Sequence, residues 1–303
     1  MKKHKMGGAL CVAMLAALLT SLMLVGSASA KLTGEFTKFQ NCPYKNLAVY
    51  RCLYSPTIGG EVVLGKKKVP IVNQAVLQGG YEEAPEEGPE AGYSKFVAAT
   101  NGQTLTKAPQ PVPGGLAGLV NCKEIKDFFL RVSCEVTFEN GLTGVNSTLE
   151  LARPASEIRV NETHLAEGQG VALKLPVRVH LENPFLGSSC YIGSSTSPIN
   201  WELRTDTTSP PPPNKPITGN PGEVEFLEEG RILKLFNVEL VDNAWSAPGA
   251  SGCGGFLVEL LLNPIINSSV GVPAAAGLNT ARLKNTIYEA PRFSVNKNNE
   301  DNP

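Results

Sequence analysis

Hydrophobic and polar positions alternate with a period of two along much of the chain after residue 30. In the run VALKLPVRVHL, one face carries Val171, Leu173, Leu175, Val177, Val179 and Leu181, and the other carries Lys174, Arg178 and His180. Such alternation is typical of a β-strand with one buried face. Pro176 lies within this run and has no N–H to donate, so we expect an edge strand or a bulge there.

Further short runs of β-branched and aromatic residues lie between Gly, Pro and Asn residues, and almost no segment has a helical period. The other predicted strands are LAVYRCLY, GEVVLGKKKVPI, SKFVAA, FLRVSCEVTF, GVNSTLELA, EIRVNETHLA, INWELRT, GEVEFLEEGRILKLF and GFLVELLL. The break at Glu228-Glu229-Gly230 predicts a hairpin. GFLVELLL is apolar on both faces and predicts a central strand. The fold class is therefore all-β, an antiparallel β-sandwich or barrel-like structure stabilised by disulfides.

The first 30 residues have the order of a secretory signal peptide. MKKHKMGG precedes an apolar run from Ala9 to Val25, and the small residues GSASA follow before Lys31. This pattern predicts cleavage after Ala30 and a secreted or cell-envelope-associated protein with no integral membrane span after cleavage. The alternative is a retained membrane helix, because the apolar run approaches the ~18 residues that a span requires.

Cleavage would remove three of the 27 basic residues and none of the 28 acidic ones, which leaves a net charge of about −4. A chain of this charge as a whole attracts neither nucleic acid nor an anionic membrane surface. We therefore expect no nucleic-acid partner.

Six of the seven cysteines follow the predicted cleavage site, and an even number in an exported chain predicts three disulfides. These cysteines are Cys42, Cys52, Cys122, Cys134, Cys190 and Cys253. Of the 15 connectivities that six cysteines allow, the spacing favours the one that joins the two pairs of near neighbours. Cys190 would then pair with Cys253 and join two distant segments. No C-x-x-C pair occurs, so we expect no metal site.

We expect residues 31–294 to form one continuous all-β region. TKAPQPVPGG offers the best candidate for a sub-boundary, near residues 106–115, and TSPPPPNKP predicts an exposed, extended loop. The polar tail, residues 295–303, is expected to be disordered.

The stretch GASGCGG places Ser251 and Cys253 in a glycine-rich turn. A hydrolase nucleophile elbow needs G-x-S-x-G between a strand and a helix, and here a cysteine occupies the last glycine position. Ser251 could still join His164 or His180 and Asp242 in a catalytic triad. The preferred interpretation is a tight turn that bends around a disulfide.

Two other features are considered as possible ligand sites. Trp245, Trp201 and Tyr191 could form an aromatic platform for sugar rings, although burial of the tryptophans is the favoured interpretation. The glutamate-rich stretch YEEAPEEGPEAGY lacks the Asp and Asn spacing of a calcium loop and predicts a solvated acidic loop. No cofactor motif is present.

Several stretches resemble a group of exported proteins of soil actinobacteria to which no function is assigned. They are NCPYKNLAVYRCLYSPTIGGEVVLG, VPIVNQAVLQGG, FLGSSCYIGSS and VDNAWSAPGASGCGG. The resemblance implies a Gram-positive, exported protein and no particular activity.

These observations favour a non-catalytic binding or structural protein, with cell-wall glycan or another envelope protein as candidate partners. The alternatives are an extracellular serine hydrolase that uses Ser251 and a cell-wall glycan-binding module that uses Trp245.

Overall fold

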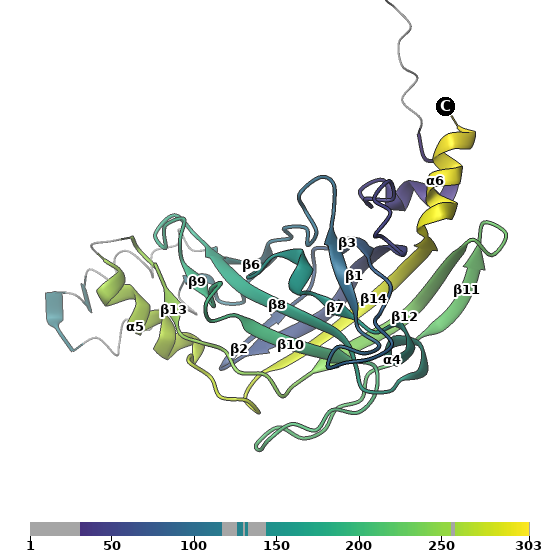
Figure 1. Ribbon diagram of the computed structural model, residues 1–303. Coiled ribbons are helices and arrows are strands. Elements are labelled where there is room, and N and C mark those ends of the chain that lie inside the picture. Colours follow the sequence, from purple (N-terminus) through teal and green to yellow (C-terminus); the bar gives the residue numbers. More distant parts are fainter. Residues whose placement is uncertain (1–30, 117–125, 130, 133–143, 256–257, 303) are drawn as a thin grey trace, which may run out of the picture.

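The computed structural model describes residues 31–116, 126–129, 131–132, 144–255 and 258–302. Their central feature is a closed barrel of eight antiparallel strands, in the order β10-β12-β14-β1-β3-β4-β7-β8, with β8 returning to pair with β10 (Figure 1). The all-β, disulfide-stabilised fold class is thus confirmed, in its barrel form. Closure leaves these strands without a free edge around the barrel.

The barrel strands are long where they carry most of the wall and short where loops complete it. They are β1 (Arg51–Leu64), β3 (Ala75–Tyr81), β4 (Ser94–Ala98), β7 (Arg159–Val160), β8 (Val171–Glu182), β10 (Ile199–Arg204), β12 (Ile232–Asp242) and β14 (Thr280–Pro291). The accessory strands are β2 (Lys67–Pro70), β5 (Gln110–Pro111), β6 (Asn146–Leu151), β9 (Tyr191–Ile192), β11 (Glu223–Leu227) and β13 (Ala250–Ser251). The helices are η1 (Gly34–Phe39), η3 (Ala155–Glu157), α4 (Glu162–Glu167), α5 (Glu259–Val270) and α6 (Arg292–Asp301).

Strand β1 bends through a register shift between Thr57 and Gly59 where it pairs with β14. Gly60 follows with a φ of +112°, and a Cβ at this position would overlap the carbonyl oxygen of Arg282. Only glycine adopts this conformation without strain and lets the two backbones approach so closely. The bend turns the long strand around the barrel.

The strand predicted from VALKLPVRVHL is confirmed as β8, but the expectation of an edge strand at Pro176 is wrong. Pro176 pairs with Asn200 of β10 on one side, and its carbonyl accepts a hydrogen bond from the Ala152 N–H on the other. The position of the missing N–H of Pro176 faces this second side. There Pro176 lies between Lys174, which pairs with β7, and Val177, which pairs with β6. A proline is therefore accommodated in the middle of a barrel because it lies at a junction between two neighbours.

The hairpin predicted around Glu228-Glu229-Gly230 is confirmed as β11–β12. The central strand predicted from GFLVELLL is wrong, because Glu259–Val270 form helix α5. Its buried residues, Leu262, Ile266 and Val270, recur every four positions, whereas Leu260 and Leu261 are exposed. An apolar run with no polar face does not distinguish strand from helix by period.

The C-terminal tail also differs from expectation. Residues 292–301 form helix α6, whose Val295 is fully buried. The Asn298 Oδ1 accepts a hydrogen bond from the Thr33 N–H at 3.0 Å, and the Tyr44 hydroxyl donates to Asn299 Oδ1 at 3.2 Å. The asparagines that suggested disorder thus bind the segment that begins the described chain.

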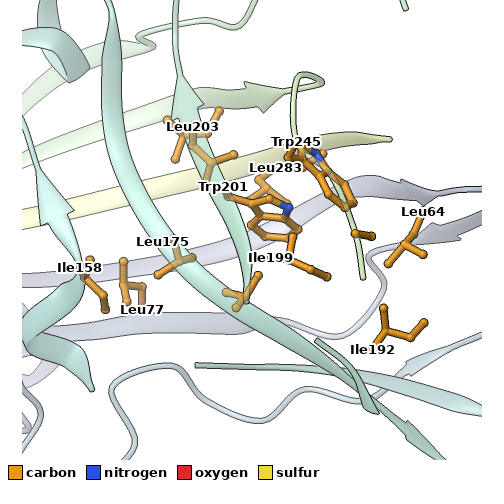
Figure 2. Close-up of a cluster of buried hydrophobic side chains, with 14 of the residues drawn as sticks. Leu64, Leu77, Ile158, Leu175, Ile192, Ile199, Trp201, Leu203, Trp245 and Leu283 are labelled. Atoms are coloured by element: carbon orange, nitrogen blue, oxygen red, sulfur yellow. The ribbon is translucent and has the colours of Figure 1, made fainter. Parts of the chain in front are cut away.

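The main hydrophobic core lies inside the barrel, and the large side chains Trp201, Trp245, Leu175, Ile199 and Leu203 belong to it (Figure 2). A second, smaller core packs η1 and α6 against the barrel wall around Phe36, Phe39 and Val295. The predicted loop at residues 208–216 is mostly exposed, and the proposed sub-boundary at residues 106–115 packs along the barrel.

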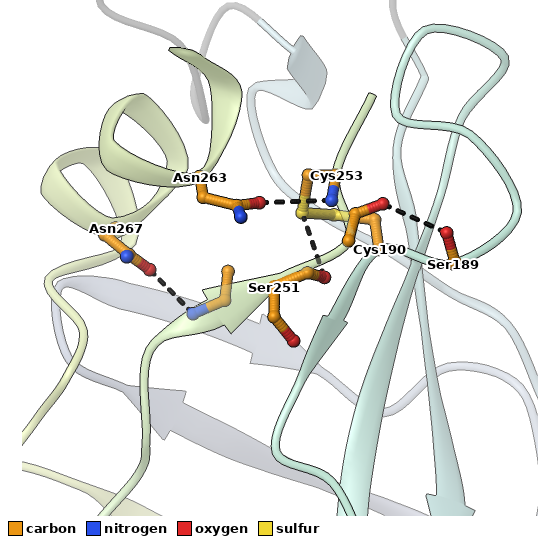
Figure 3. The surroundings of a disulfide bond; sticks show 8 residues. Ser189, Cys190, Ser251, Cys253, Asn263 and Asn267 are labelled. Carbon is orange, nitrogen blue, oxygen red and sulfur yellow. Dashed lines mark hydrogen bonds between the residues drawn. A yellow bond between two sulfur atoms is a disulfide. The ribbon is translucent and has the colours of Figure 1, made fainter. Parts of the chain in front are cut away.

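Two of the three predicted disulfides are present, Cys42–Cys52 and Cys190–Cys253. Cys122 and Cys134 lie outside the described residues, as do the predicted signal peptide and most of FLRVSCEVTF. The turn GASGCGG is the anchor that the sequence favours: Cys253 Sγ bonds Cys190, and the Asn263 Oδ1 and Asn267 Oδ1 of α5 accept from Cys253 N and Ala250 N (Figure 3). Gly252 has a φ of +70°, and a Cβ there would overlap the carbonyl of Ser189.

Candidate ligand-binding cavity inside the barrel

The barrel contains a cavity of about 130 Å³. Six of the eight barrel strands contribute to its lining, among them β3 with Leu77, β8 with Leu175, β10 with Trp201, β12 with Leu240 and β14 with Leu283. Most of the lining side chains are aliphatic. The cavity is thus a direct consequence of the alternation along the strands, because each strand turns its apolar face inward.

A segment that runs from β3 to β6, residues 105–112 (the strap), lines one side of the cavity with Leu105, Ala108 and Val112. The side chain of Gln110 holds it in place. Its Oε1 accepts from the N–H groups of Val72 and Asn73, at 2.8 and 2.9 Å, and its Nε2 donates to the carbonyl oxygens of Asn73 and Ala108. The strap also pairs with β6 through β5.

Polar side chains interrupt the apolar wall at a few points, among them Lys67, Gln110 and Asn285. Asn285 of β14 lines the cavity beside Ser55 and Thr57 of β1 and is 5 % exposed. Its Nδ2 donates to Ser55 Oγ at 3.3 Å and to Thr57 Oγ1 at 3.1 Å. Its Oδ1 is buried and has no hydrogen-bond partner among the described residues. An unpaired buried acceptor of this kind costs about 1–3 kcal/mol, so its presence calls for an explanation.

A different polar cluster lies further along β14, around a residue that points inward like Asn285. This acidic cluster consists of Arg51, Tyr81, Glu162 and Glu289. The Arg51 Nε lies 3.3 Å from Glu162 Oε2. Burial raises the pKa of Glu289 to about 7, with a further contribution from the charge of Glu162, and Arg51 and Tyr81 partly offset both. None of the four residues lines the cavity.

The predicted aromatic residues do not form a surface platform. Trp201 and Trp245 are 1 % and 4 % exposed, and their rings meet edge to face at 6.0 Å (Figure 2). Trp245 Nε1 donates to the Asp242 carbonyl at 3.2 Å. Trp201 lines the cavity from the inner face of β10. Tyr191 lies on the outside of the barrel, stacked on His180 at 4.4 Å.

The residues of the suggested triad are not brought together. Ser251 pairs with Tyr191, and Tyr191 pairs with His180, so a strand that carries an aromatic ring separates the serine from that histidine. His164 belongs to α4, at the opposite end of the barrel from β13 (Figure 1), and its Nδ1 lies 2.9 Å from the Val171 carbonyl oxygen. Asp242 accepts from the Glu202 and Ala244 N–H groups, and burial raises its pKa.

The glutamate-rich stretch around residues 82–90 is largely exposed, and Glu90 pairs with Arg159 at 3.0 Å. Within the described part of the chain, no group of three or more His, Cys, Asp or Glu side chains is arranged to hold a metal ion. No helix among the described residues combines the length and apolar character needed to cross a membrane.

No family model, curated protein or solved structure matches this chain. The cavity is therefore interpreted from its own geometry. Sequence reasoning missed it because strands β3 and β14 were not predicted. In β14, the inward positions are Ala281, Leu283, Asn285, Ile287 and Glu289, so two polar residues obscure an otherwise regular alternation. The polar residues Asn285 and Glu289 at inward positions were the signal in the sequence that could have pointed to the site.

Proposed function

We propose that this protein is a non-catalytic binding protein that holds a small apolar molecule inside its barrel, outside the cell. The observation that carries the proposal is the mostly aliphatic cavity lined by the barrel wall and the strap. Ligand sites are typically concave and mostly apolar, with a few placed polar groups, and barrels of eight strands are just wide enough for one small ligand.

The size of the cavity limits the ligand. An apolar cavity of about 150 Å³ stays dry and binds benzene. At about 130 Å³, the barrel cavity suits a single ring or a short branched chain. Its wall carries little charge, so the ligand is neutral, because an unpaired ion would lose its hydration on entry.

Export rests on separate support. The first 30 residues have the order of a signal peptide, and the Cys42–Cys52 and Cys190–Cys253 bridges are of the kind that persists in oxidising compartments. The resemblance to exported actinobacterial proteins agrees with this location. Intact mass of the protein recovered from the culture medium should correspond to a chain that begins at Lys31 and has no free thiols.

Titration of the oxidised mature chain with p-xylene, followed by ¹H–¹³C methyl NMR, tests the binding function. We expect saturable shifts for the methyl groups of Leu77, Leu175 and Leu283, which line the cavity. Val179→Phe adds a ring to the cavity wall and should abolish these shifts. Val224→Phe makes the same change at an exposed valine of β11, so it should leave them intact. Absence of saturable binding of p-xylene and of ring-sized neutral analogues that carry a polar group would contradict the proposal.

Neither alternative from the sequence gains support. A serine hydrolase needs a histidine within hydrogen-bond reach of the nucleophile, and among the described residues Ser251 has none. A glycan platform needs an exposed aromatic face, and Trp245 is buried.

A further inference from the structure

The wall of the cavity is apolar except at a few points, and one of them combines a buried amide with two hydroxyl groups. We call Ser55, Thr57 and Asn285 the polar triplet. Thr57 and Asn285 are directly paired across β1 and β14, and Ser55 lies in the same phase of β1. The register of the two strands therefore fixes the triplet, and it does not depend on a loop.

The hydrogen bonds within the triplet use the amide N–H groups of Asn285 and leave its carbonyl oxygen without a partner. Nδ2 donates to both hydroxyl oxygens, at 3.3 and 3.1 Å, whereas Oδ1 meets no donor in the described part of the chain. The side chain is 95 % buried, so bulk solvent does not satisfy this oxygen. A leucine at this position would avoid the cost, as the neighbouring inward residues Leu283 and Ile287 do.

We propose that the ligand carries a hydroxyl group that donates a hydrogen bond to Asn285 Oδ1, and that the rest of the ligand is apolar. This inference rests on the proposed binding function and names its ligand class: neutral alcohols or phenols of about one ring in size. A carboxylate would place its oxygens against the unpaired acceptor, and a plain hydrocarbon would leave that acceptor unsatisfied.

Three probes of similar shape test the assignment: p-cresol, which has a hydroxyl donor, p-xylene, which has no polar group, and p-tolunitrile, which only accepts. Dissociation constants come from NMR titration of the oxidised mature chain. The ratio of the p-xylene to the p-cresol dissociation constant should fall about tenfold in Asn285→Leu, the size expected for one buried hydrogen bond. The matched control Asn200→Leu changes an exposed asparagine on the outer face of β10 and should leave the ratio unchanged.

A measurement on the unmodified chain covers the case in which Asn285→Leu fails to fold. The ¹³C resonance of the Asn285 side-chain carbonyl should shift on binding p-cresol and stay in place on binding p-xylene. A preference for p-tolunitrile, or an unchanged ratio in the variant, overturns the ligand class while the binding function stands. Failure of all three probes to bind overturns the binding function itself.

Discussion

The two ends of the barrel interior show two ways of burying polar groups. Asn285 and Glu289 occupy the same inward phase of β14, four residues or about 13 Å apart. At Glu289, the acidic cluster brings together a guanidinium group, a phenol and two carboxyl groups. At Asn285, a mostly aliphatic cavity adjoins an unpaired amide oxygen.

This difference separates a structural polar group from one that fits a ligand. The acidic cluster offsets part of its desolvation internally, because Arg51 lies against Glu162 and opposes the charge of Glu289. The polar triplet has no complementary charge and lies beside empty space. Polar groups that a fold leaves unsatisfied next to a cavity are therefore the better candidates for recognition.

The largest expected contrast between the two ends comes from their disulfides. Cys190–Cys253 lies at the cavity end and spans 63 residues, whereas Cys42–Cys52 adjoins Arg51 and spans 10. Chain entropy predicts that the double alanine variant of the longer bridge loses about 4 kcal/mol of unfolding free energy, against about 3 kcal/mol for the shorter one. Urea denaturation of the two variants provides the comparison. A larger loss for the shorter bridge would contradict the entropic account.

The next prediction concerns the acidic cluster and pH. The pKa of Glu289 is raised from 4.5 to about 7, so between these values the folded chain binds more protons than the unfolded chain. The free energy of unfolding should therefore fall as the pH rises through this range. Glu289→Gln removes the titration, so it should match the unmodified chain near pH 4 and be more stable than it near pH 8. At about 1.4 kcal/mol for each pKa unit, the difference is on the order of 3 kcal/mol.

Urea denaturation at both pH values measures this difference. Glu225→Gln is the control, because Glu225 is an exposed partner of Lys234 and its loss should not change the pH dependence. If Glu289→Gln follows the pH dependence of the unmodified chain, then Glu289 is not buried against Glu162 as described.

The contrast between the two ends also explains what the sequence could predict. Strand β8, the β11–β12 hairpin and the pairing of Cys190 with Cys253 follow from local alternation, turn residues and spacing. Strand β14 escaped prediction because Asn285 and Glu289 interrupt its apolar face. The closure of β8 onto β10 depends on register between distant segments, which one sequence does not reveal.

A smaller effect is expected at the strap. Gln110→Ala leaves the N–H groups of Val72 and Asn73 without their acceptor and weakens the attachment of the strap, which keeps its backbone pairing with β6. The unfolding free energy should fall by about 1–2 kcal/mol. The exchange rate of bound p-xylene, measured by NMR line shape, should rise. Gln103→Ala changes an exposed glutamine just before the strap and should alter neither quantity. Slower exchange in Gln110→Ala would show that the strap does not restrict entry.

The last comparison separates two buried asparagines at the cavity end. Asn279 is fully buried, donates to the carbonyl oxygens of Trp245 and Ala275 and accepts from the Gly65 N–H. Asn279→Leu leaves all three groups unpaired, so we expect a loss of at least about 2 kcal/mol.

Asn285→Leu should behave differently in the absence of ligand. It removes an unpaired acceptor and adds apolar volume to the cavity, while the hydroxyl groups of Ser55 and Thr57 lose a donor. These opposing contributions should leave the unfolding free energy within about 1 kcal/mol of the original, on the stabilising side. Urea denaturation of both variants without ligand makes the comparison. A loss for Asn285→Leu as large as that for Asn279→Leu would mean that Asn285 serves the fold, because residues kept for binding are those whose replacement costs little stability.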